Sequence, residues 1–226
     1  MGRNPDRDAR ELASRKLKIL RTAFPIFAEK TIDKVSMQEI ADACGMSLAT
    51  LYRHYGGKSE LVLAVATWAW ESYLEVNVAR WRGEGCATAA ETFAFYRDSF
   101  IGMYRDHRDL LRFNQFFNVY VQNERVSPEL MEPYLAMIRG LAALFHDMYL
   151  LGERDATLRT DIPEKEMFSA TLHLMLAAVT RYAVGLVYLE GTDAEQELLL
   201  QKELLLTRYA GQACGKPAER GGIKEF

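Results

Sequence analysis

The sequence predicts an all-α protein, with a small N-terminal three-helix bundle and a C-terminal bundle of about six helices. Three observations support this fold class. Apolar residues recur at helical spacing through most of the 226 residues. No segment alternates apolar and polar residues as a half-buried strand does, and glycine, proline and serine interrupt the helical pattern at several points. Hydrophobic residues make up 49% of the chain, which excludes a wholly disordered protein.

The N-terminal residues predict a mobile start and then a first helix. Residues 1–10 are polar, and we expect them to be mobile. Residues 12–30 carry an apolar stripe at helical spacing, formed by Leu17, Leu20, Phe24 and Phe27. Pro25 lies inside this helix and is expected to bend it, because proline lacks the backbone N–H.

Capping residues predict the two short helices that follow. Ser36 is a favourable N-cap with Glu39 three residues later, as in a capping box, and this helix is expected to end at Gly45. Ser47 is placed to cap a third helix, which ends at the two glycines 56–57.

Longer helices account for the rest of the chain. Ser59 is placed to cap a fourth helix that reaches about residue 82. Further helices are predicted near residues 88–105, 109–124, 128–151, 163–189 and 193–210. The glycine-rich, charged residues 211–226 are predicted to form a flexible tail.

Charge is divided unevenly along the chain, although the net charge is only −3. Residues 1–60 contain eleven Lys and Arg against eight Asp and Glu, so they carry +3 and the remainder carries −6. A basic N-terminal segment on an acidic body suits a module that faces phosphates.

Cysteine usage and hydropathy predict a cytoplasmic protein. Its three cysteines lie far apart, which argues against a disulfide framework or a metal cluster. The first 15 residues lack the apolar stretch of a signal peptide. Residues 167–189 are long enough to span a membrane, but Arg181 within them is costly in lipid. We therefore interpret this segment as a buried helix and expect no contact with a membrane.

Residues 36–55 have the residue types that a helix-turn-helix needs. Gly45 follows the helix that starts after Ser36, at a tight turn that favours positive φ. Ala41 in that helix is small and leaves room for the next helix to cross it steeply. The inner faces and the corner are expected to consist of Ile40, Cys44, Met46, Leu51 and Tyr55. The rim and outer face of the second helix carry Leu48, Ala49, Tyr52, Arg53 and His54. Such a helix can enter the major groove of double-stranded DNA, whereas the alternative is a helical hairpin that only packs.

In and around these residues the sequence resembles the TetR (tetracycline repressor) family of bacterial transcription regulators. The resemblance covers roughly residues 15–65. It is carried in register by Phe27, Ala28, Glu29, Lys30, Ser36, Ile40, Ala41, Gly45, Met46, Ser47, Thr50, Leu51, Tyr52, Tyr55 and Lys58. Two positions depart from the pattern, since Thr31 stands where the family usually has glycine and Pro25 interrupts the first helix.

The resemblance implies contacts with DNA for particular residues. Positions that contact or approach phosphates match Ser36, Ser47, Thr50, Tyr52 and Lys58. Positions that face base edges match Leu48, Ala49 and Arg53, with His54 beside them. Arg53 can pair with a guanine or hold a phosphate, and both roles stay open.

The last two predicted helices are apolar on most faces, although a surface helix has a single apolar stripe. The leucines of residues 193–210 point nearly all round the helix axis. Together with residues 163–189 this helix is expected to form a four-helix interface in a homodimer, as the family resemblance also implies. The alternative is that both helices are central in a monomer core.

Aromatic and methionine side chains are dense in residues 93–149, which with the family resemblance predicts a pocket for a small apolar or aromatic effector. The residues expected to bind it are Phe93, Tyr96, Phe100, Phe117, Tyr134, Ile138 and His173. An ordinary bundle core is the alternative for most of them. Arg181 either orients the ligand or pairs with an acid at the dimer interface.

We find no motif for catalysis, a metal or a cofactor, so we do not expect an enzyme. We expect a DNA-binding domain at residues 1–58, a sensing and dimerisation domain at 59–210, and a tail at 211–226. The expected function is a ligand-responsive transcription regulator, most often a repressor in this family, which binds a palindromic operator as a dimer. The alternatives are a ligand-independent or architectural DNA-binding protein and an enzyme with a DNA-binding head.

Overall fold

The structure, a computed structural model, describes residues 5–188, 190–191 and 193–211. The predicted all-α class is confirmed, since apart from one isolated bridge between Leu158 and Ala210 the regular elements in these ranges are helices. Their bounds are α1 Pro5–Glu29, η1 Ile32–Lys34 (a 3₁₀ turn), α2 Met37–Cys44, α3 Leu48–His54, α4 Lys58–Glu84, α5 Ala89–Asp106, α6 Arg108–Glu124, α7 Pro128–Asp155, α8 Glu164–Ala183 and α9 Ala194–Tyr209.

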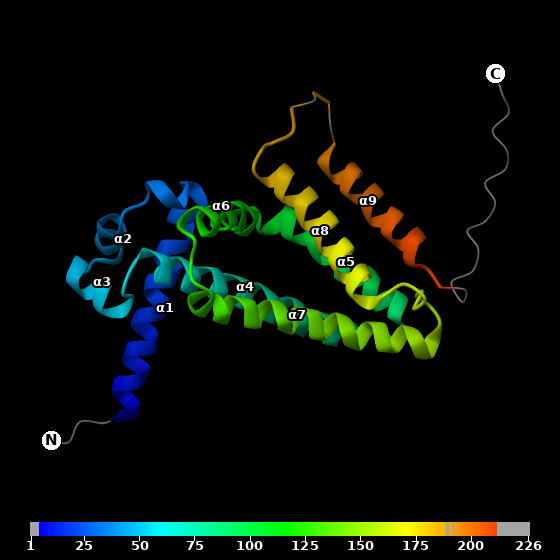
Figure 1. The fold of residues 1–226 in the computed structure, drawn as a ribbon, viewed down its shortest axis with the longest axis horizontal. Coiled ribbons are helices and arrows are strands. Elements are labelled where there is room, and N and C mark those ends of the chain that lie inside the picture. Colours follow the sequence, from blue (N-terminus) through cyan, green and yellow to red (C-terminus); the bar gives the residue numbers. More distant parts are fainter. Residues whose placement is uncertain (1–4, 189, 192, 212–226) are drawn as a thin grey trace.

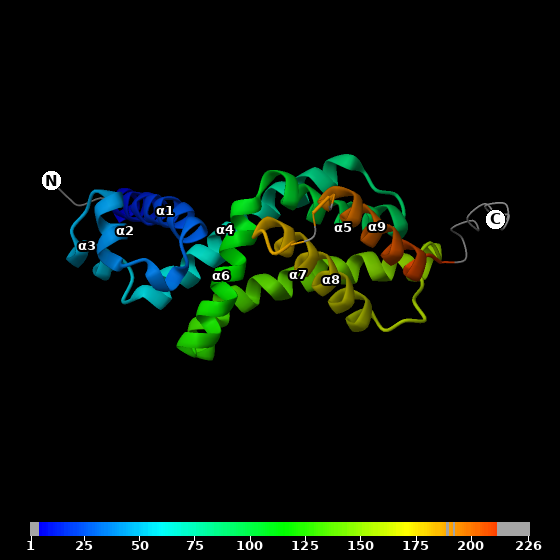
Figure 2. The same ribbon diagram turned by 90° about the horizontal axis from the view of Figure 1, so that it is seen from above.

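The molecule is elongated, with α1, α2 and α3 grouped at one end and the longer helices filling the other (Figures 1 and 2). The long helix α4 leaves this end group and runs beside α7 into the larger bundle (Figure 1). Helices α8 and α9 lie side by side in both views, at the upper right of the bundle in Figure 1. The predicted C-terminal bundle of about six helices corresponds to α4 to α9.

Polar N-caps fix where several helices begin. In each case a side-chain oxygen accepts a hydrogen bond from a backbone N–H in the first turn, which would otherwise lack a partner. These caps are Ser36, Ser47, Thr88, Ser127 and Asp193. The predicted capping box at Ser36 is only half formed, because the Glu39 carboxylate instead pairs with the Lys30 ammonium at 2.5 Å.

Two predictions about helix starts are wrong. The first helix was expected to start near residue 12, but α1 already begins at Pro5, since proline is favourable in a first helical turn; residues 1–4 lie outside the described part. Ser59 does not cap α4, which has Gly57 at its N-cap. The Ser59 hydroxyl instead shares a hydrogen bond of 2.9 Å with the Tyr120 hydroxyl on α6.

Helix α7 extends beyond its predicted end at residue 151, and helix α8 stops before its predicted end at residue 189. Helix α7 continues through Gly152, where a Cβ atom would lie 3.3 Å from the Leu158 Cβ, so this glycine permits close packing and does not end the helix. Helix α8 ends at Ala183 and not near residue 189, because Gly185 has φ +75° and the Leu186 N–H donates to the Arg181 carbonyl at 3.0 Å. This left-handed ending stops a helix although the apolar pattern continues. Of the predicted tail at residues 211–226, residues 212–226 lie outside the described part, and the Gly211 N–H donates to the Thr157 carbonyl at 2.9 Å.

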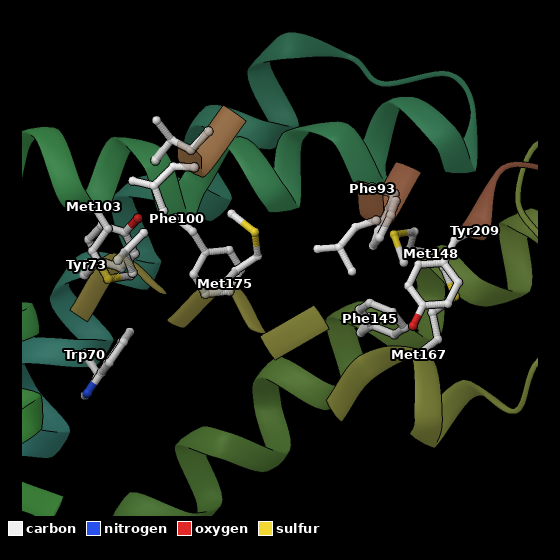
Figure 3. Close-up of a cluster of buried hydrophobic side chains, with 14 of the residues drawn as sticks. Trp70, Tyr73, Phe93, Phe100, Met103, Phe145, Met148, Met167, Met175 and Tyr209 are labelled. Carbon is white, nitrogen blue, oxygen red and sulfur yellow. The ribbon is translucent and has the colours of Figure 1, made fainter. Parts of the chain in front are cut away.

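Two clusters of buried side chains form the interior. One joins α1 to α3 with the first turns of α4 and with Phe113, Phe117 and Tyr120 of α6. The other fills the larger bundle, where Phe93, Phe145 and Met148 gather near Tyr209, and Trp70, Tyr73 and Met103 form a separate group (Figure 3). Helices α4 and α6 contribute side chains to both clusters. The end formed by α1 to α3 is therefore connected to the larger bundle through side chains of α4 and α6.

Within the described ranges, one helix is long and apolar enough to cross a membrane, namely α7. Core helices of soluble proteins pass the same test of length and composition. Helix α7 packs along α4 and α5.

Candidate nucleic-acid interface

The corner between α2 and α3 has the geometry that the sequence predicts. Gly45 has φ 67° and ψ 38°, in the left-handed region, and the Met46 N–H donates to the Ala41 carbonyl at 3.0 Å. Ala41 and Leu51 are completely buried, and Tyr55 is nearly so. Burial raises the pKa of the Tyr55 hydroxyl to about 12, so it stays neutral at physiological pH. Tyr55 is thus a core residue that anchors α3.

Helix α3 presents a mostly polar face to solvent. Ala49, Tyr52 and Arg53 are exposed, with 46% of Tyr52 accessible, while Leu48, Thr50 and His54 are half-buried. Leu51 is the fully buried residue of α3, and the partly exposed Leu48 packs against the same core. The residues predicted to read DNA therefore lie together on one accessible surface.

The predicted phosphate contacts are arranged around the ends of α2 and α3. The Ser47 hydroxyl accepts the Thr50 N–H at 3.2 Å and lies 2.9 Å from the Thr50 hydroxyl, so these two groups are held together. Ser36 is exposed at the start of α2. Lys58 is half-buried and donates from Nζ to the Asp33 carbonyl at 3.2 Å. Burial lowers the pKa of Lys58, although nearby carboxylates oppose the shift.

Two basic residues that sequence reasoning did not assign to the interface extend it. The pKa of His54 is lowered first by burial and then by the positive charges of Arg53, Lys16 and Arg15. The first helix therefore places Arg15 and Lys16 close to the end of α3. Both side chains are exposed. Arg15 lies on the face of α1 opposite the apolar stripe, which was the available signal, whereas Lys16 lies beside that stripe, one turn before Ile19. The position of these two residues near the end of α3 was not predictable from spacing.

Interactions among the N-terminal helices hold α1 against α2. The Lys18 ammonium donates to the Cys44 carbonyl at 3.0 Å, at the C-terminal end of α2, where the helix dipole favours a cation. Burial raises the pKa of the Cys44 thiol, so it is a neutral core residue. These contacts keep the basic face of α1 and the exposed face of α3 in a fixed relation.

The larger bundle contains an apolar cavity of about 90 Å³ between α4, α5 and α7. Its walls include Trp81, Phe95, Tyr96, Leu141, Leu144 and Phe145. Of the residues predicted to bind an effector, only Tyr96 lines this cavity.

The structure does not bring the other predicted effector residues together. Phe93 and Phe100 are buried in the bundle core, whereas Phe117 and Tyr134 pack against each other at 4.8 Å beside the N-terminal cluster. Ile138 is half-buried against the bundle core on α7. His173 is exposed in a separate surface depression with Arg181. Helical spacing identified the aromatic residues and Ile138 as inward-facing, but it cannot tell which neighbour each one faces, and His173 does not face inward.

Helices α8 and α9 each bury one apolar face and expose another. On α9, Leu198 and Leu205 are buried, while Leu200 and Leu204 are 57% and 60% exposed. On α8, Met175 is completely buried and Leu174 is 43% exposed. The outer faces of this pair therefore leave leucines in contact with solvent.

A buried arginine that the sequence did not reveal connects α5 to α9. Arg97 is only 1% exposed, and its guanidinium lies 4.8 Å from the centre of the Phe93 ring. Nε donates to the Phe93 carbonyl at 3.2 Å, and a terminal nitrogen donates to the Lys202 carbonyl on α9. Burial lowers the pKa of Arg97.

Comparison with known proteins identifies the N-terminal segment. Residues 19–65 match the sequence profile of bacterial regulatory proteins of the tetR family. No match to the chain was found among curated proteins.

Several solved structures share the fold over nearly the whole chain. A putative transcriptional regulator from Saccharomonospora viridis, solved with choline, has a TM-score of 0.71 at 17% identity, with 88% of this chain and 100% of that chain covered. The fatty acid degradation regulator FadR from Bacillus halodurans has a TM-score of 0.67 at 14% identity, covering 91% and 97% of the two chains. FadR from Bacillus subtilis, solved with stearoyl-CoA, also has a TM-score of 0.67, at 16% identity and covering 84% and 97%. At these identities the likeness shows a common fold.

Proposed function

We propose, on the premise that this chain belongs through its N-terminal segment to the TetR family of bacterial regulatory proteins, that it is a cytoplasmic transcription repressor. In this proposal a homodimer binds a palindromic operator, and a small effector weakens that binding. The observation that carries the proposal is the exposed face of α3, flanked by Arg15 and Lys16 of α1. A short helix with an accessible outer face and adjacent cations suits the major groove and the phosphates beside it.

Within this interface we assign roles by chemistry. Tyr52 and Arg53 are exposed and bear hydrogen-bond donors, so we place Tyr52 on a phosphate and Arg53 on a phosphate or a guanine. Leu48 and Ala49 offer apolar contact, for example to thymine methyl groups. Lys58 is held near the Asp33 carbonyl and would reach a phosphate only at the edge of the interface.

The exposed leucines of α8 and α9 support a dimer. A four-helix interface would bury them and would place two copies of α3 on one side of the assembly to read two half-sites. We therefore propose two domains. Residues 1–58 bind DNA, and residues 59–210 dimerise and bind the effector.

Helix α4 connects the cavity to the DNA-binding end, and this connection supports the proposal that an effector weakens DNA binding. Trp81, in the second half of α4, lines the cavity, whereas Leu61, Val62 and Val65 at its start belong to the N-terminal core. A ligand that binds two arrangements of these helices with different affinity would shift the spacing of the two DNA-binding ends. The related fold in complexes with choline and with stearoyl-CoA supports ligand binding in this class of structure.

Footprinting on DNA from beside the protein's own gene tests the proposal. We expect protection of a palindromic site by the wild-type chain and its loss in Tyr52→Ala and in Arg53→Ala. Arg112→Ala is the matched control, because this exposed arginine lies on α6, outside the helix-turn-helix. Unchanged protection by both α3 variants would refute the assignment.

A further inference from the structure

In the walls of the cavity between α4, α5 and α7, four polar side chains donate hydrogen bonds to backbone carbonyls of the protein itself. Tyr73 donates from its hydroxyl to the Ser99 carbonyl at 2.7 Å, and Asn77 donates to the Tyr73 carbonyl at 2.9 Å. The hydroxyls of Ser99 and Thr92 donate to the Tyr96 and Thr88 carbonyls at 2.6 and 3.1 Å. These side chains therefore have little reason to bind a polar ligand group.

Tyr96 differs from these four residues. Its hydroxyl is buried and has no hydrogen-bond partner among the described residues. Burial raises the pKa of this phenol, so it remains protonated and able to donate. The ring is held between Phe100 and Phe145, at 5.3 and 5.6 Å between ring centres, which fixes the position of the hydroxyl. A buried hydroxyl without a partner is unfavourable, and a ligand oxygen would relieve that cost.

The wall of this cavity carries no charged side chain, since none of its described residues is Lys, Arg, Asp or Glu. The nearest buried cation in sequence, Arg97, is directed to the carbonyls of Phe93 and Lys202 and to the Phe93 ring, on the side of α5 that meets α9. A charged ligand would lose its hydration without gaining an opposite charge.

The volume limits the size of the ligand. A dry apolar cavity of about 150 Å³ accommodates benzene, and the cavity here measures about 90 Å³. Because the cavity is smaller than that, a single ring enters only if wall side chains such as Leu141 and Leu144 rotate away, and a larger ligand would have to separate α4 from α7. The aromatic walls formed by Trp81, Phe95 and Phe145 suit the faces and edges of such a ring.

We propose, building on the effector-responsive function proposed above, that the cavity binds a neutral ligand of single-ring size with one hydrogen-bonding oxygen, which pairs with the Tyr96 hydroxyl. A simple phenol has this chemistry. The rest of the ligand is held by apolar contact alone.

Isothermal calorimetry with three para-substituted toluenes tests this proposal without DNA. The probes are p-cresol, p-xylene, which replaces the hydroxyl by a methyl group, and 4-methylbenzoate, which is charged. We expect the wild-type chain to bind p-cresol and p-xylene and to bind 4-methylbenzoate much more weakly. In Tyr96→Phe the ratio of p-cresol to p-xylene affinity should fall roughly 3- to 10-fold, the worth of one neutral hydrogen bond.

Two control variants separate the hydroxyl from general effects on the bundle. Tyr104→Phe removes a hydroxyl from the same helix away from the cavity and should leave the ratio unchanged. Leu144→Phe fills the cavity and should weaken both neutral probes. An unchanged ratio in Tyr96→Phe, equal binding of 4-methylbenzoate, or no binding of either neutral probe would overturn the proposal. Footprinting distinguishes these failures from failure of the DNA-binding function, since it needs no ligand.

Discussion

The outer leucines of α9 give a quantitative prediction about assembly. Leu200 and Leu204 are four residues apart on the helix and are 57% and 60% exposed in the protomer. Full burial of a leucine contributes about 1.5–3 kcal/mol. Because roughly 60% of each side chain remains to be buried, each would contribute about 0.9–1.8 kcal/mol at a dimer interface. The four copies in a dimer would contribute about 4–7 kcal/mol.

Replacing both by Glu should therefore raise the dimer dissociation constant about 10³- to 10⁵-fold and give monomers at micromolar concentration. The protomer should stay folded, since neither side chain is in its core. Light scattering after size-exclusion chromatography gives the mass, and circular dichroism gives the helix content. The matched control is Leu135→Glu with Leu150→Glu, which places the same charges on exposed leucines of α7. A wild-type monomer, or a double Leu200 and Leu204 variant that remains dimeric, would refute the assignment of this face.

Three further predictions concern single side chains. Gly45→Ala should destabilise the fold by about 1–2 kcal/mol, because φ is 67° at this residue. Gly140→Ala within α7 is the control and should stabilise the fold by about 0.5–1 kcal/mol. A Gly45→Ala variant that is as stable in thermal unfolding as Gly140→Ala would contradict the corner geometry. Tyr96→Phe should leave the melting temperature unchanged or raise it, since it removes a buried hydroxyl without a partner, and a clear loss of stability would point to a partner. His54 has a lowered pKa and is neutral at pH 7 in the free protein. Phosphates raise that pKa, so operator affinity should increase as the pH falls from about 7.5 to about 6, and His54→Gln should abolish the increase in a fluorescence anisotropy titration.

The helix-turn-helix was predictable in detail because its constraints are local. A glycine in the left-handed region, a small residue at the crossing and serine caps each act within a few residues, so Ser36, Gly45 and Ser47 have the roles that the sequence predicts. The exposed face of α3 followed from the same spacing. The neighbouring cations of α1 did not, because Arg15 and Lys16 come near His54 only through the tertiary packing of the three-helix end.

The cavity was not predictable for the same reason. Phe93, Tyr96 and Phe100 all point inward from α5, yet only Tyr96 reaches the space beside α4 and α7. Hydrophobic spacing measures burial and carries no information about which helix is the neighbour. Arg97 shows the converse case, since a charged residue in an inward position is buried by carbonyl partners that are remote in sequence.

The salt dependence of operator binding tests the central claim, that the basic face of α1 and α3 binds DNA phosphates. If Arg15, Lys16, Arg53 and Lys58 of both protomers each neutralise one phosphate, the logarithm of the association constant should fall with the logarithm of salt concentration with a slope of about −7. Removing one of these cations, as in Lys16→Ala, should reduce the magnitude of the slope by about 2 for the dimer. A profile that stays flat between low and physiological salt, or a slope unchanged by these variants, would contradict the account.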